Sequence, residues 1–143
     1  MDELVLQWRR RDRADHANAD RRFLDFVVGG RSLYDAHRRD LISPLGWGVP
    51  EWQDHTARKL LGEASADIEE GRVAIYVCPE CGDVSCGSIT VQLTREPGVV
   101  TWADAANSWL DSGTEGWHHD PLGWPTLRFE EAAYRRILTR RTA

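Results

Sequence analysis

The sequence has no long apolar run and only three cysteines, and each shortage narrows the class of protein. None of its 143 residues lie in a stretch near the roughly twenty apolar residues that a membrane-spanning helix needs. The first residues, Met-Asp-Glu-Leu-Val-Leu, lack the basic segment and apolar stretch of a secretory signal. We therefore expect a cytoplasmic protein without a membrane partner, in which thiols stay reduced.

Lysine is almost absent too. The basic residues are seventeen arginines and Lys59, and the acidic residues exceed them to give a net charge of −5. The best basic clusters, 9–11 and 38–39, are interleaved with aspartates. A nucleic-acid-binding domain usually presents a basic patch, so the composition argues against a nucleic-acid partner.

Catalytic motifs are missing as well. The chain has no Gly-x-Ser-x-Gly elbow, no phosphate-binding Gly-x₄-Gly-Lys loop and no His-Glu-x-x-His pair. Its five histidines fall in no spacing that a known mechanism requires. We predict no catalytic residue, and a non-enzymatic role is the leading interpretation.

Apolar periodicity predicts a single α+β domain over residues 1–143. Residues 4–8 alternate between apolar and polar and residues 23–28 are mostly apolar, so each stretch predicts a strand. Gly29-Gly30 predicts a tight hairpin turn after the second strand. Residues 72–102 predict an antiparallel meander, with an N-terminal hairpin beside it. A few helices should pack on this sheet, including one at 50–61 and a C-terminal one at 130–140.

All the cysteines lie in Cys78-Pro-Glu-Cys81-Gly-Asp-Val-Ser-Cys86-Gly. Cys-Pro-x-Cys-Gly is typical of a knuckle that points two thiolates at one zinc ion, and Cys86 would supply a third ligand. The fourth would be His118, His119, Asp83, Glu80 or water. Two other interpretations stay open: an inert tight turn, and a redox or reactive thiol cluster. The redox interpretation lacks the helix that usually lowers a thiol pKa.

Strand parity adds an expectation about these thiols. If Ile89 and Val91 face the core, then Ser88 and Thr90 face outward. The same alternation places Cys78 and Cys86 on the less apolar face of the sheet, at the ends of adjacent strands. We therefore expect those two thiols to meet.

Seven tryptophans are many for this length. Trp109, Trp117 and Trp124 lie in a segment, 103–125, that has few aliphatic residues and several glycines and prolines, and we expect this segment to be irregular. Tryptophan is a leading hot-spot residue of interfaces, so these three are candidates for a partner-binding surface. The alternative is that they fill a core short of aliphatic side chains.

Several motifs together resemble a group of small bacterial, mainly actinobacterial, proteins of unknown function. The resemblance starts near residue 23 and rests on 26–33, 60–63, 99–102, 129–134 and, above all, the Cys-Pro-x-Cys-Gly-Asp-x-x-Cys-Gly core of 78–87. It implies an α+β domain and no catalytic residues. This chain departs from the group after Trp102, where Ala105-Ala-Asn-Ser-Trp109 intervenes.

The leading hypothesis is thus a binding or accessory module, of the kind that immunity proteins represent, with a protein partner. Its cysteine turn would be structural and would hold zinc if metal is bound. The alternative is a small metalloenzyme or thiol-redox protein that uses the cysteine cluster.

Overall fold

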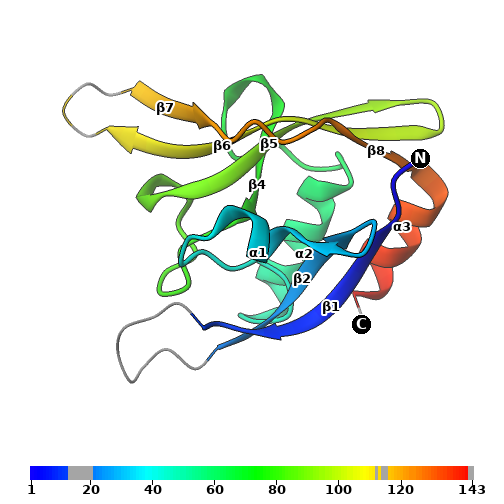
Figure 1. Cartoon of the computed structure of the whole chain (residues 1–143), viewed down its shortest axis with the longest axis horizontal. Coiled ribbons are helices and arrows are strands. Elements are labelled where there is room, and N and C mark those ends of the chain that lie inside the picture. The colour runs from blue at the N-terminus through cyan, green and yellow to red at the C-terminus, as the bar shows by residue number, and fades with distance from the viewer. Residues whose placement is uncertain (13–20, 112, 114–115, 142–143) are drawn as a thin grey trace.

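Two antiparallel sheets and three α-helices form the structure, a computed structural model that describes residues 1–12, 21–111, 113 and 116–141 (Figure 1). The first sheet has the order β1-β2-β3, with strands β1 (Leu4–Arg10), β2 (Arg22–Val28) and β3 (Arg31–Ser32). The second has the order β4-β5-β6-β7, with strands β4 (Arg72–Tyr76), β5 (Ser88–Glu96), β6 (Val99–Asp111) and β7 (Gly116–Pro121). Strand β8 (Leu127–Glu130) pairs with the first part of β6. The helices are α1 (Leu33–His37), α2 (Pro50–Leu60) and α3 (Glu131–Arg140), and the short 3₁₀ turns are η2 (Glu69–Gly71) and η3 (Val84–Cys86).

This arrangement confirms the predicted α+β class, the 72–102 meander, the N-terminal hairpin and the C-terminal helix. Gly29 and Gly30, at φ of 58° and 81°, form the two-residue turn between β2 and β3, because only a residue without Cβ adopts these angles cheaply. Pro50 starts α2 as predicted. Within the described ranges, no helix combines the length and the apolar character needed to cross a bilayer.

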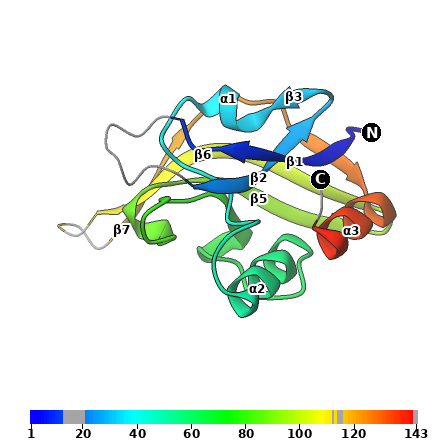
Figure 2. The same ribbon diagram turned by 90° about the horizontal axis from the view of Figure 1, so that it is seen from below.

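The three-stranded sheet lies over the second sheet (Figure 2), and a cluster of aromatic rings joins the two in the core. Phe26 of β2 meets Tyr76 of β4 edge-on, with ring centroids 5.7 Å apart, and Trp102 of β6 at 5.3 Å. The Trp102 indole N–H donates to the Tyr134 hydroxyl at 3.1 Å, which ties α3 to the sheet. Such edge-to-face pairs add about 0.5–1.5 kcal/mol each beyond the burial of their area.

The expectation that residues 103–125 are irregular is largely wrong. Strand β6 continues to Asp111 and β7 returns antiparallel to it, with Ala106 opposite Pro121 and Asp111 opposite Gly116. The resulting β6–β7 hairpin projects beyond the rest of the molecule (Figure 1). Because most of β7 is exposed on both faces, it needs no apolar alternation and carries none.

The predicted outward orientation of Ser88 and Thr90 is also wrong, since both are fully buried. Hydroxyl groups satisfy each other there: Thr90 Oγ1 lies 2.8 Å from Ser108 Oγ, and the Ser88 hydroxyl donates to the Val84 carbonyl at 3.2 Å. Paired hydroxyls can be buried at little cost. Both faces of this sheet are therefore covered near the start of β5.

Candidate functional site

The cysteine-bearing segment forms a tight turn followed by η3. The Gly82 N–H donates to the Cys78 carbonyl at 2.8 Å, which closes the turn between them. Cys81 Sγ and Cys86 Sγ lie 3.7 Å apart, and the Asp83 N–H donates to Cys81 Sγ at 3.4 Å. Cys81 and Cys86 are exposed, and Cys78 is half-buried.

Two contacts fix this turn on the body of the protein. Gly82, at φ of 72°, lies so close to Trp52 that an added Cβ would meet its ring at 3.2 Å. The buried Arg11 donates to Glu80 of the turn at 3.0 Å and also pairs with Asp40 at 2.6 Å. The hydrogen bond with Asp40 is the main cause that raises the pKa of Arg11 above its usual range. The turn is thus held by both packing and charge.

The thiols that meet are Cys81 and Cys86, and not Cys78 and Cys86 as strand parity predicted. The reason is that neither Cys78 nor Cys86 lies in a strand: β4 ends at Tyr76 and Cys86 belongs to η3, so strand parity does not place their thiols. Two thiolates bound to one tetrahedral zinc ion at about 2.3 Å lie about 3.8 Å apart. The 3.7 Å separation of Cys81 and Cys86 fits that distance. Among the described residues, however, no three His, Cys, Asp or Glu side chains are arranged to hold a metal ion.

The two candidate histidine ligands lie on β7, where neighbouring side chains point to opposite faces. His118 Nε2 is 3.2 Å from Asp111 Oδ2, and His119 Nδ1 is 2.6 Å from Ser108 Oγ. Desolvation, and next the positive charge of Arg72, lower the pKa of His119. Each histidine therefore has its own polar partner, and strand alternation prevents both from serving one metal ion together.

The three candidate tryptophans are divided among separate places. Trp109 stacks on His118 with centroids 5.3 Å apart, and Trp117 lies parallel to His119 at 6.5 Å. Because these two pairs occupy opposite faces of the β6–β7 hairpin, they form two small surfaces. Trp124 is half-buried and packs against the core.

A hollow of about 450 Å³ lies beside one face of this hairpin. Leu110, Trp117 and His119 of the hairpin line it on one side, and Glu69 and Glu70 of η2 line it on the other. Among the described residues, neither glutamate side chain has an ion pair. The hollow therefore combines an apolar wall with two unneutralised carboxylates.

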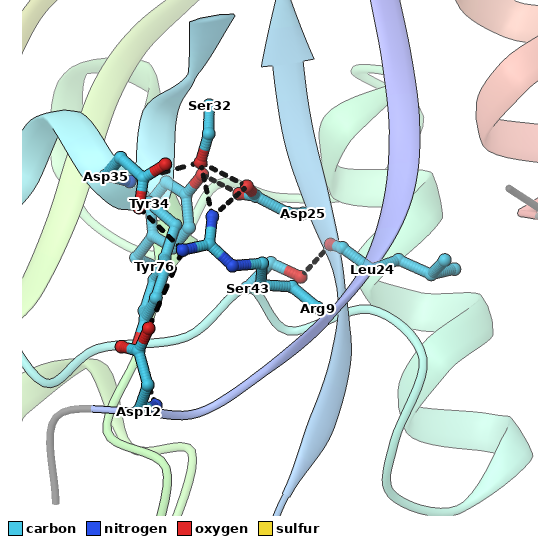
Figure 3. Close-up of polar contacts among 9 residues, drawn as sticks. All are labelled: Arg9, Asp12, Leu24, Asp25, Ser32, Tyr34, Asp35, Ser43 and Tyr76. Carbon is cyan, nitrogen blue, oxygen red and sulfur yellow. Dashed lines mark hydrogen bonds and ion pairs between the residues drawn. The ribbon is translucent and has the colours of Figure 1, made fainter.

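A buried polar network that sequence reasoning missed joins the two sheets (Figure 3). Its centre is Asp25 of β2, of which 1% is exposed. The Tyr76 hydroxyl of β4 donates to Asp25 Oδ1 at 2.6 Å, and the Ser32 hydroxyl donates to Oδ2 at 2.5 Å. Arg9 Nη1 lies 3.8 Å from the same carboxylate, and Arg9 Nη2 pairs with Asp35 at 2.6 Å. Asp25 and Tyr76 are 51 residues apart, so no local pattern indicates that they pair.

The network has a definite electrostatic character. Burial is the main cause that raises the pKa of Asp25, and the hydrogen bonds from Ser32 and Tyr76 and the charge of Arg9 oppose it. Burial, together with the nearby Asp25 charge, raises the pKa of Tyr76 well above its ordinary value. Since both groups are almost fully buried, they cannot reach a substrate from solvent. We interpret the network as structural.

Comparison of this chain with protein-family models, with curated proteins and with solved structures finds no match. The resemblance based on the cysteine core therefore stays a prediction. The site has to be judged from its own geometry.

We predict that Asp25→Asn changes how stability depends on pH. A raised pKa means that folded Asp25 binds its proton more tightly than unfolded Asp25, whose pKa is about 3.9. The wild type should therefore lose stability, relative to Asp25→Asn, as the pH rises from about 4 through the raised pKa. Urea unfolding of both proteins at several values between pH 4 and pH 7 measures the difference.

Tyr76→Phe provides the matched variant. It removes a hydrogen bond that favours the charged carboxylate, so the pKa of Asp25 should rise further and the loss of stability should be larger. A constant difference between wild type and Asp25→Asn at every pH would contradict this account.

Proposed function

We propose that this protein is a non-enzymatic binding module and that the β6–β7 hairpin is its docking surface for a protein partner. The observation that supports this most is two large apolar side chains on the projecting strand, Trp109 on one face of the hairpin and Leu110 on the other, which are 37% and 41% exposed. Exposed aromatic and aliphatic side chains on a projecting element are typical of interaction sites. The absence of a motif for catalysis in the sequence agrees with this role.

The edge of β7 indicates how a partner binds. In the described part of the chain, β7 pairs with β6 and with no strand on its other side. Its outward N–H and C=O groups are therefore available to an added strand. We propose that an extended segment of the partner pairs with this edge.

The hollow beside the hairpin indicates the chemistry of that segment. Its apolar wall of Leu110 and Trp117 suits the aliphatic stem of an arginine or lysine, and Glu69 and Glu70 suit the charged end. The partner segment should therefore place a basic side chain in this hollow. The net charge of −5 would also attract a basic segment from a distance, and added salt would screen this attraction.

We predict that Trp109→Ser combined with Leu110→Ser abolishes capture of a partner. Loss of two hot-spot side chains costs about 2 kcal/mol or more, which lowers affinity at least roughly thirtyfold. The measurement is a pull-down from the native host with the tagged protein, followed by a binding titration with the recovered partner. Val5→Ser is the control, because Val5 is equally exposed, at 43%, but lies on β1 of the other sheet.

If the wild type recovers no protein, or if the hairpin variant and Val5→Ser bind equally well, the proposal fails. Glu69→Gln with Glu70→Gln should weaken binding and reduce its dependence on salt, because the basic side chain of the partner loses its counter-charge.

We propose in addition that the cysteine turn binds zinc as a structural ion. The supporting observations are the 3.7 Å separation of Cys81 and Cys86, and the backbone N–H that Asp83 directs at Cys81 Sγ, which stabilises a thiolate. Cys78 lies at the start of the same turn and would be the third ligand.

We predict that the purified untagged protein holds about one zinc ion per chain and that Cys86→Ser lowers zinc affinity at least tenfold. Elemental analysis and competition with a chelating dye measure these values. Ser85→Ala is the control, since Ser85 adjoins Cys86 but has no thiol. Protein without zinc, in which Cys81 and Cys86 instead form a disulfide reversibly, would favour the redox alternative.

A further inference from the structure

A large cleft lies away from the hairpin and from the cysteine turn. It is a cleft of about 610 Å³ between the β2–β3 turn, α1 and the segment that leads into β8. In Figure 2, α1 and β3 lie at the top of the molecule with the orange segment near residues 120–130 behind them. Small-molecule sites in proteins commonly have volumes of about 300–1,000 Å³.

The lining of this cleft is apolar and polar in equal parts, and its apolar residues lie on two sides. Val28 and Leu33 form one side, and Trp124, Pro125 and Leu127 form the other. Trp124 is half-buried against the core, so its indole ring is held in place and one part of it still borders the cleft. A fixed indole ring is a good stacking surface for a flat molecule.

Some polar side chains that line the cleft already have a polar partner within the protein, and others do not. The Ser32 hydroxyl donates to Asp25, and the Asp35 carboxylate is paired with Arg9 at 2.6 Å. By contrast, the side chains of Arg31 and Arg38 are exposed and have no ion pair among the residues that the structure describes. Two unneutralised guanidinium groups therefore border one cleft of an acidic protein.

We infer that this cleft binds a small planar aromatic molecule that carries a phosphate or carboxylate group. Trp124 stacks on the ring, and Arg31 and Arg38 bind the anion through their forked N–H donors. Val28, Leu33 and Leu127 supply apolar contacts for the edges of the ring. The site is separate from the β6–β7 hairpin, so this inference does not depend on the proposed docking surface.

The test is calorimetric titration of the full chain with four probes. Adenosine 5′-monophosphate and indole-3-carboxylate each combine a ring with an anion, adenosine has the ring alone, and inorganic phosphate has the anion alone. At least one of the first two should bind with a Kd below about 1 mM. Adenosine and phosphate should each bind at least tenfold more weakly than the better of the first two probes.

Variants show whether this binding occurs in the cleft. Arg31→Gln with Arg38→Gln should weaken the better probe at least tenfold, and both positions are exposed, so folding should not suffer. Arg136→Gln is the control, because Arg136 is exposed on α3, is not part of the cleft lining, and also has no ion pair among the described residues. Trp124→Leu should weaken the same probe, after its thermal unfolding has been checked.

Three results would overturn the inference. The first is that neither ring-and-anion probe binds at up to about 10 mM. The second is that adenosine binds as tightly as its monophosphate and indole-3-carboxylate. The third is that the double arginine variant binds the better probe as tightly as the wild type.

Discussion

The carboxylate of Asp25 is the constraint on which the arrangement of the two sheets depends. It is buried in β2, and its two oxygens accept hydrogen bonds from Ser32 of the same sheet and from Tyr76 of the other. A buried carboxylate costs free energy unless its oxygens are paired, so the sheets stack favourably only in the position that brings Tyr76 to Asp25. Phe26, the next residue, then meets the rings of Tyr76 and Trp102. The polar contact specifies the position, and the aromatic packing stabilises it.

Local patterns predicted a large part of this fold. The meander at 72–102 could be predicted because its strands carry closely spaced apolar residues and Pro97-Gly98 marks the turn between two of them. The C-terminal helix could be predicted because Tyr134 and Leu138 recur at helical spacing, and both are buried. The turn at Gly29-Gly30 followed from the conformations that glycine alone adopts easily. In each case the signal lies within a few residues of the structure that it specifies.

The features that could not be predicted depend on distant residues or on exposed strands. Asp25 and Tyr76 pair across 51 positions, and nothing near either residue indicates the other. The β6–β7 hairpin has polar residues on both faces, so its sequence resembles that of a loop although β6 and β7 pair from Ala106–Pro121 to Asp111–Gly116. Spacing alone predicted a cysteine turn, but Cys78 follows the end of β4 and Cys86 lies in η3, so strand parity could not show that Cys81, and not Cys78, approaches Cys86.

We propose that the projecting β6–β7 hairpin binds a partner along the outer edge of β7. Strand β5 joins this hairpin to the rest of the sheet. Hydrogen–deuterium exchange of the protein with and without the captured partner tests this most directly, because an added strand protects the amides of the edge to which it pairs. The account predicts that slowed exchange is concentrated in 116–120 and in the facing part of β6. Protection confined to other surfaces, with unchanged exchange at 116–120, would contradict it.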